Sequence, residues 1–267
     1  EHRFKLFSEE LKEKLAYRPV CVHASMRSFG SNRIEAGELL DELLALGCTV
    51  IAPTFTYDLE QPAPAGDRPS QNGWAYDEWM PLSHERRFDI RGQHLSLSEM
   101  GIFPATMLSR SECVRGNHPI NSFAGVGPRA SEMIDMQAPH RVYGPFEKLC
   151  EEGGLVLLVG VDYTSLTLLH FAEQCSGQNL FRRWALDAQG RVIACQVGGC
   201  SDGFSAFEEV LSPYDELVGN ARLRVLEAAT VVEQAVSAIR SEPKIGRCGN
   251  PQCQRCRDAS LGGPIFV

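Results

Sequence analysis

Gly154-Leu-Val-Leu-Leu-Val-Gly-Val161 is the stretch of the sequence that decides the fold. Its continuous apolar residues between glycines predict a short strand that is buried on both faces. A helix is expected from about Ser165 to Cys175, a few residues further along the chain. A buried strand followed closely by a helix is the repeating unit of parallel sheets, so this stretch predicts an α/β fold.

Two more strands are expected at Pro19–Ala24 and Thr49–Pro53, with a helix between them over Glu35–Leu46. Gly47 would close this helix, because glycine accepts the left-handed conformation of a helix end. Strand, helix and strand in this order predict parallel pairing within the same sheet.

The chain after residue 53 is expected to be less regular. Thr54–Ser98 lacks hydrophobic periodicity, and a long segment of this kind in a compact domain is usually functional. A loop is also expected over Ser111–Gly127, and a last helix over roughly Ala221–Ile239. Phe181–Leu186 and Arg191–Val197 predict an antiparallel hairpin. We therefore predict a single α/β domain with a mostly parallel central sheet, helices on both faces and an antiparallel addition.

Composition and charge exclude several classes of protein. The 267 residues carry 26 basic and 34 acidic side chains, a net charge of −8, which argues against nucleic acid as a partner. The sequence has no apolar run of about 18 residues, so no membrane span is expected. Glu1–Phe7 lacks the apolar stretch of a secretion signal, and a cytoplasmic location is expected. The ten cysteines are then expected to be thiols or metal ligands.

A candidate acid–base site follows the buried strand. The strand ends at Gly160, and Thr167, His170 and Glu173 lie three residues apart on the expected helix, where such residues are neighbours. A carboxylate beside an imidazole fixes its tautomer and suits a general base. Ligands of open α/β sheets bind beyond the carboxyl ends of the strands. Spacing alone leaves open a half-buried helix with a satisfied histidine and a solvated glutamate.

Two loops carry further candidate binding residues. Val22–Gly30 has small hydroxyl residues, glycine and one arginine between a strand and a helix, so its backbone N–H groups could cradle a phosphate or a pantetheine chain. It has neither a Walker lysine nor a G-x-G-x-x-G motif. Arg115–Pro128 concentrates charge, imidazole, hydroxyl and glycine. Ordinary turn chemistry would also explain both loops.

Taken together, the motifs resemble those of one family. His23–Gly30, Pro53–Thr56, Arg115–Ala124 and Thr167–Glu173 stand in the order found in the aminoglycoside 3-N-acetyltransferase family. Shorter matches extend the resemblance to about residue 240; they are Tyr143-Gly-Pro, Lys148-Leu149 and Val218-Gly-Asn-Ala221. The resemblance implies an acyltransferase domain over residues 1–240 and leaves residues 241–267 as a cysteine-containing tail.

The resemblance also implies the chemistry. Acetyl-CoA, or another acyl-CoA, would donate the acyl group, and an amino group of an amino sugar would accept it, as in antibiotic resistance. His170 would be the general base, Glu173 its orienting partner and Thr167 a hydroxyl near the tetrahedral intermediate. Direct transfer in a ternary complex is expected, because no cysteine lies beside His170 in the motif. The expected CoA site comprises Ser25, Met26, Arg27, Ser28, Phe29, His118, Ser122 and Phe123.

The acceptor is less well defined. The family usually has serine at the position of Ala24, and Glu60–Arg87 has no counterpart in its pattern. Tyr57 could stack on a sugar, and acidic side chains could hold ammonium groups, although each could equally be a surface or capping residue. The acidic candidates are Asp58, Glu99, Asp202, Glu208 and Asp215.

Three functions remain open from the sequence. The acceptor could be an aminoglycoside, or a nucleotide-linked 3-amino-deoxysugar of surface glycan biosynthesis, because the arginines within Glu60–Arg87 would suit a diphosphate. A non-catalytic binding protein is the third, and the intact Thr167, His170 and Glu173 argue against it. A homo-oligomer is compatible with each.

The tail carries a candidate metal site. Cys248, Cys253 and Cys256 have the Cys-x4-Cys-x2-Cys spacing of a zinc knuckle, and also match part of an iron–sulfur pattern. A fourth ligand is missing locally, and Cys195 or Cys200 could supply it. Unliganded surface thiols are the alternative.

Overall fold

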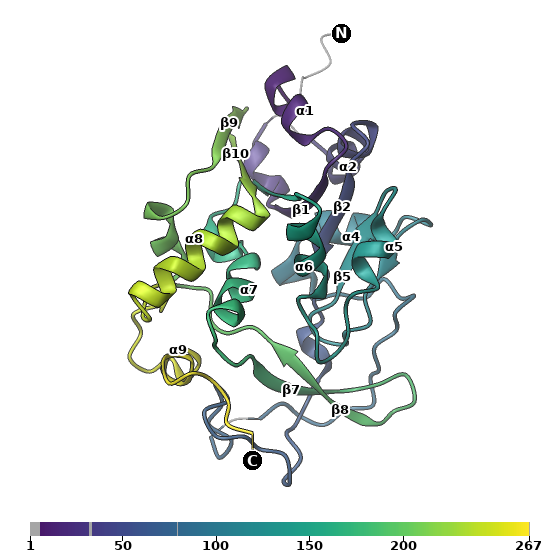
Figure 1. Cartoon of the computed structure of the whole chain (residues 1–267). Helices are drawn as coiled ribbons and strands as arrows, with labels where there is room; N and C mark the ends of the chain where they lie inside the picture. Colours follow the sequence, from purple (N-terminus) through teal and green to yellow (C-terminus); the bar gives the residue numbers. More distant parts are fainter. Residues whose placement is uncertain (1–5, 32–33, 79, 267) are drawn as a thin grey trace.

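The computed structural model describes residues 6–31, 34–78 and 80–266. Residues 1–5 lie outside the described residues. The expected absence of a secretion signal rests partly on them. The stretch that opens the sequence analysis forms β6 (Leu155–Val159), and all five of its residues are buried. β6 lies within a seven-stranded sheet of order β4-β5-β2-β1-β6-β10-β9 (Figure 1).

Parallel pairing is confined to the three central strands. β1 (Pro19–Ala24) pairs in parallel with β2 (Thr49–Pro53) on one side and with β6 on the other, with Val22 opposite Leu157. The flanking strands are antiparallel; they are β10 (Ala221–Glu227), β9 (Tyr214–Val218), β5 (Phe123–Val126) and β4 (Val114–Arg115).

Helices cover both faces of this sheet, because successive residues of the buried strands point to opposite sides. Val20 and Val22 pack in one hydrophobic cluster, whereas Cys21 packs in the other. The first cluster is closed by α1 (Glu9–Leu15), α2 (Ala36–Ala45) and α4 (Ile102–Leu108). The second is closed by α5 (Ala130–Ile134), α6 (Gly144–Glu151), α7 (Leu168–Cys175) and α8 (Ala228–Ser241). The predicted α/β class with helices on both faces is confirmed.

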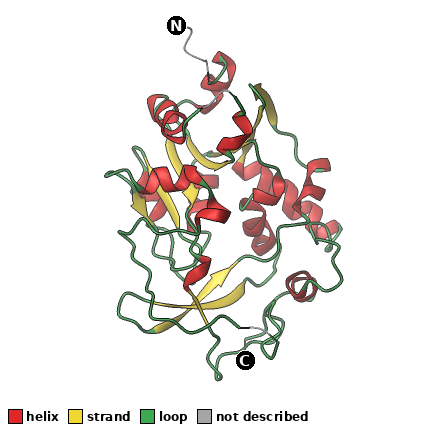
Figure 2. Cartoon of the chain, turned by 180° about the vertical axis from the view of Figure 1, so that it is seen from behind, coloured by secondary structure: helices red, strands yellow, loops and turns green. Residues whose placement is uncertain are grey.

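A second, three-stranded sheet lies beyond the carboxyl ends of the parallel strands. It consists of β7 (Phe181–Leu186) and β8 (Val192–Val197), the predicted hairpin, with β3 (Glu60–Gln61) added at one edge. Long loops run past this small sheet, as the view from behind shows (Figure 2). Two short helices, α3 (Leu97–Met100) and α9 (Gln254–Ser260), complete the described elements other than 3₁₀ turns.

Two expectations about local structure are wrong. The helix expected over Ala221–Ile239 is a strand, β10, followed by α8. Ala221, Leu223 and Val225 belong to one hydrophobic cluster and alternate with two arginines, so this segment has the period-two pattern of a strand. The expected helix runs the helical spacing of α8 over this pattern. The loop expected over Ser111–Gly127 contains β4 and β5, which are too short and too rich in small residues to be recognised. No helix in the described ranges is long and apolar enough to span a membrane.

Candidate active site

The carboxyl ends of the three parallel strands open into one cavity of about 320 Å³. His23 at the end of β1, Pro53 at the end of β2 and Val161 just after β6 all line it. His170 lines the same cavity from the first half of α7. The geometry follows from the topology, because parallel strands end at the same edge of a sheet.

His170 and Glu173 form a buried hydrogen-bonded pair. Nδ1 of His170 lies 2.9 Å from Oε2 of Glu173, and the two residues are 8% and 3% exposed. A carboxylate at this position accepts a hydrogen bond from Nδ1–H, which leaves the lone pair on Nε2. No hydrogen bond to Nε2 is present among the described residues, so this nitrogen is free to accept a proton at the cavity.

Glu173 is held from its other side by Arg247. Nη1 of Arg247 donates to Oε1 of Glu173 at 2.6 Å, and Nη2 donates to Oε1 of Gln178 at 2.8 Å. The carboxylate therefore lies between an imidazole and a guanidinium, with one oxygen for each. The charge-assisted bond to Arg247 fixes the orientation of the carboxylate. Arg247 comes from the tail and was not predicted as a site residue.

The His170 ring is confined by its neighbours. The Phe204 ring lies 4.7 Å away between centroids. A Cβ on Gly198 would come within 2.7 Å of the His170 ring and 2.5 Å of the Tyr143 hydroxyl, closer than real contacts allow. Gly198 therefore has to be glycine for the imidazole to keep this position.

Thr167 and Tyr143 are two of the hydroxyl residues that line the cavity with His170. Thr167 is at the N-cap position of α7, where its side chain makes no capping bond. The Tyr143 hydroxyl is buried, and no described group hydrogen-bonds to it. Burial raises the pKa of Tyr143 well above its usual value, so this group remains a hydrogen-bond donor at neutral pH. Tyr143 was part of a sequence motif but was not predicted to be in the site.

A second cavity of about 310 Å³ adjoins the first. The two share Ala24, Glu99, Met100 and Val161 as lining residues. The second cavity is lined on one side by Ser25, Met26 and Arg27, three of the predicted CoA residues, and on the other by residues 97–102.

The other predicted CoA residues lie behind the cavity walls. Ser28 Oγ donates to the Ser25 carbonyl at 2.7 Å and braces the loop, and Phe29 is fully buried in the core. His118 Nδ1 accepts from the Asn121 N–H at 2.8 Å, and Nε2 donates to the Gln196 carbonyl, also at 2.8 Å.

Ser122 and Phe123 complete this hidden layer. Ser122 Oγ donates to the Thr54 carbonyl at 2.8 Å, and Phe123 packs edge-on against Phe146. None of these five described residues lines either cavity, so they support the site from behind its walls. They are Ser28, Phe29, His118, Ser122 and Phe123.

The predicted acceptor residues divide into two groups. Tyr57 and Glu99 line the first cavity. Asp58 is held by Arg86 and His94, Glu208 by Arg224, and Asp215 by Arg222. These three acidic residues line neither of the two described cavities. Asp202 does not line them either, although its neighbour Ser201 lines the first cavity.

Three further charged residues of the first cavity escaped the sequence analysis. Glu60 and Arg183 come from the small sheet, and Arg255 comes from α9. Arg183 is 1% exposed, stacks 4.2 Å above the Trp74 ring, and has no partner for Nε and Nη2 among the described residues. Burial lowers the pKa of Arg183 to about 10 and raises that of Glu60. The only sequence signal for Arg183 as a site residue is its position on the inward-facing side of the predicted hairpin.

Comparison with known proteins gives consistent matches. Residues 21–240 match a family model described as aminoglycoside 3-N-acetyltransferase. Aminoglycoside N(3)-acetyltransferase VIII of Streptomyces fradiae is 36% identical over 121 residues, which cover 44% of this chain and 38% of that protein. The chain thus matches well under half of the length of this relative.

Several solved structures share the fold, and two of them serve as examples. Aminoglycoside acetyltransferase AAC(3)-IVa, solved as the apoenzyme, has a TM-score of 0.73 at 21% identity, covering 98% of this chain and 99% of that one. AAC-IIIb, solved as a binary complex with CoASH, has a TM-score of 0.66 at 22% identity, covering 87% and 92%.

Proposed function

The chain belongs to the aminoglycoside 3-N-acetyltransferase family, and we propose that it transfers an acetyl group from acetyl-CoA to an amino group of an aminoglycoside. The family expected from the sequence motifs is thereby confirmed. The observation that carries the proposed reaction is the His170–Glu173 pair, whose imidazole lines the first cavity at the ends of the parallel strands.

In the proposed mechanism His170 is the general base. The acceptor nitrogen must lose a proton as its lone pair attacks the thioester carbonyl, and Nε2 of His170 takes that proton. Glu173 stabilises the resulting imidazolium, and Arg247 keeps the carboxylate in place. When the tetrahedral intermediate collapses, the C–S bond breaks and the CoA thiolate takes the proton from Nε2.

Hydroxyl groups are proposed to stabilise the intermediate. Its oxygen gains negative charge as the carbon–nitrogen bond forms, so a donor fixed in advance lowers the barrier. Thr167 and Tyr143 both line the cavity beside His170, and the buried Tyr143 hydroxyl has no described partner. We assign this role to one or both of them.

Acetyl-CoA is proposed to lie along the second cavity. Ser25, Met26 and Arg27 line it, and Arg27 supplies positive charge for a phosphate. Neither cavity is lined by a cysteine of the described residues, which supports direct transfer without an acyl-enzyme. The ten cysteines form no disulfide with one another, which suits a reducing compartment, so the proposal includes a cytoplasmic location.

The first cavity would hold the acceptor. Glu60 and Glu99 could bind ammonium groups of an aminoglycoside, and Tyr57 offers an aromatic face to a sugar ring. Relatives such as the Streptomyces fradiae protein are named for N(3)-acetylation of aminoglycosides.

A nucleotide-linked 3-amino-deoxysugar is the second candidate acceptor. Arg183 and Arg255 both line this cavity, and Nε and Nη2 of Arg183 are buried without described partners. Paired guanidinium groups suit a diphosphate, because they can form bidentate charge-assisted bonds with phosphate oxygens.

An acceptor screen with acetyl-CoA tests the proposal. Release of the CoA thiol would be followed with aminoglycosides in one series and amino-sugar nucleotides in the other. His170→Ala should lower kcat at least about a hundredfold, the usual contribution of a general base, while CoA affinity stays unchanged. His140 is exposed and lies outside both cavities, so His140→Ala is the matched control. Full activity of His170→Ala would contradict the assignment of the base.

A further inference from the structure

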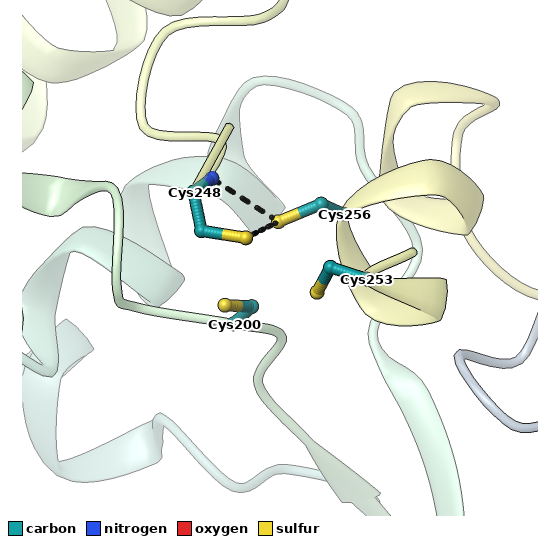
Figure 3. Close-up of side chains that lie close together, drawn as sticks. All are labelled: Cys200, Cys248, Cys253 and Cys256. Carbon is teal, nitrogen blue, oxygen red and sulfur yellow. Dashed lines mark hydrogen bonds between the residues drawn. The ribbon is translucent and has the colours of Figure 1, made fainter. Parts of the chain in front are cut away.

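Four cysteines, one after the small sheet and three in the tail, point toward one another (Figure 3). Cys200 follows the small sheet, Cys248 and Cys253 lie in the tail, and Cys256 is in α9. All four sulfur atoms lie within 4.8 Å of one another. It is the only group of three or more potential metal ligands of this kind in the part of the chain that the structure describes.

The arrangement fits one tetrahedral ion. With Zn–S bonds of about 2.3 Å, the sulfur atoms of a tetrahedral site lie about 3.8 Å apart. The Sγ atoms of Cys248 and Cys256 are 3.5 Å apart, far longer than the roughly 2.05 Å of a disulfide bond. A cluster of several iron atoms would need room for inorganic sulfide between the thiolates, which the close grouping does not provide.

The tail needs such a crosslink. Between residues 242 and 266, the described residues bury only three apolar side chains, those of Cys256, Ala259 and Pro264. α9 has seven residues, too few to be stable alone in water. Asp258 ties α9 to the Gly73 N–H at 2.8 Å, but so little buried apolar surface does not offset the entropy of ordering this segment.

We propose that Cys200, Cys248, Cys253 and Cys256 bind one zinc ion, and that this ion holds the tail against the active site. Each cysteine binds as a thiolate and releases its proton to solvent, so four protons leave for each ion bound. With four protein ligands the site is closed, and the ion is structural, with no position for a substrate. The structure identifies Cys200, rather than Cys195, as the fourth ligand of the predicted cysteine site.

Two arginines connect the metal site to catalysis. Arg247 directly precedes Cys248 and donates to Glu173 of the His170 pair. Arg255 lies between Cys253 and Cys256 and lines the first cavity. Zinc bound to four thiolates carries a net charge of −2, which neighbouring guanidinium groups offset. Losing the ion would release both arginines from their positions.

The contact between Cys200 and the tail is close-packed. A Cβ on Gly203 would lie 2.4 Å from the Arg247 carbonyl group, so the loop after Cys200 and the start of the tail touch through their backbones. A small movement of the tail would therefore displace Arg247. The metal site does not depend on the proposed function, whereas its link to catalysis rests on it.

Metal analysis of the full chain is the primary test. Protein purified without added metal should contain about one equivalent of zinc, released by an organomercurial after about four thiols have reacted. Less than about 0.1 equivalent, with no tight uptake on adding zinc, would overturn the proposal. Iron in place of zinc, or a disulfide between Cys248 and Cys256, would overturn it as well.

A matched pair of variants tests the ligands and the coupling. Cys253→Ser should lose the zinc, speed hydrogen exchange of the tail amides and lower kcat about tenfold or more, while the amides of β1 and β6 remain protected. Cys175 is exposed and outside the cluster, so Cys175→Ser should keep both zinc and activity. Zinc at the wild-type level in Cys253→Ser would refute the ligand assignment, and unchanged kcat after loss of zinc would refute the coupling.

The two proposals can fail separately. Protein with one zinc and no acetyl transfer to any acceptor would leave the metal site standing and end the proposed function. Active protein without zinc would support the proposed function and end the proposed metal site.

Discussion

Replacing Glu173 with glutamine should nearly abolish catalysis, although the shape of the side chain hardly changes. The reason lies in the two partners of the carboxylate. Oε1 accepts from Arg247 and Oε2 from His170, so an amide has to choose which partner receives its oxygen. If the NH₂ group faced Arg247, two donors would meet in a buried site and cost about 1–3 kcal/mol.

The amide oxygen of Glu173→Gln should therefore stay with Arg247, and the NH₂ group should face Nδ1 of His170. Nδ1 then has to accept, which places the ring proton on Nε2 and removes the lone pair that faces the cavity. Loss of general-base catalysis is worth about 10²–10⁴ in rate, or about 3–5 kcal/mol of activation free energy. The expected change is in kcat, because neither acceptor nor CoA contacts are removed.

The assay is steady-state kinetics of thiol release, with CoA affinity measured separately. The double variant Glu173→Gln/Arg247→Met is the informative comparison. Without the guanidinium, the amide is free to turn its oxygen toward Nδ1 of His170. A preference of about 1.4 kcal/mol for this orientation corresponds to a tenfold higher kcat than in the single variant. A single variant within about threefold of wild type, or a double variant no faster than the single one, would refute this reasoning.

Three other substitutions test separate parts of the site. Tyr143→Phe should lower kcat by about 10²–10³ if its hydroxyl stabilises the oxyanion, with unchanged CoA affinity by calorimetry; an unchanged kcat would leave that role to another donor. Gly198→Ala should displace the His170 ring and reduce kcat, whereas Gly66→Ala, with no atom within 4 Å of the new Cβ, should behave as wild type in the same assay. Burial lowers the pKa of His118 to about 4, below its usual value of 6.5. Between these two pH values the unfolded chain binds more protons than the folded protein, so the stability falls as the pH falls. Urea unfolding at pH 7 and pH 5 should show a loss of about 2 kcal/mol from this residue, which His118→Gln should remove, and equal losses in both proteins would contradict the assignment.

The parts of the fold that could be predicted are those with local signals. β6 and α7 are recognisable because an unbroken apolar strand and a helical spacing lie within about twenty residues of each other, and the His170–Glu173 contact lies within one helical turn. β10 also has a local signal, because Ala221, Leu223 and Val225 alternate with two arginines, but the helical spacing of α8 follows directly and hides the boundary between the two elements.

The rest of the site depends on contacts between distant residues. Arg247 is 74 residues from Glu173 in the sequence, and nothing around Arg247 indicates a catalytic partner. The position of Cys200 beside the tail cysteines likewise requires the small sheet to be in place. Predicted binding residues such as His118 and Ser122 carry motif-like chemistry but use it to hold backbone groups behind the cavity wall.

The Arg247–Glu173 contact also has a consequence for the order of biosynthesis. At about 5–20 residues per second, a ribosome adds Arg247 roughly 4–15 s after Glu173. During that interval the nascent chain can already contain the parallel strands and α7, yet its base lacks the guanidinium that orients it. The contact that orients Glu173 is therefore among the last of the site to form during synthesis.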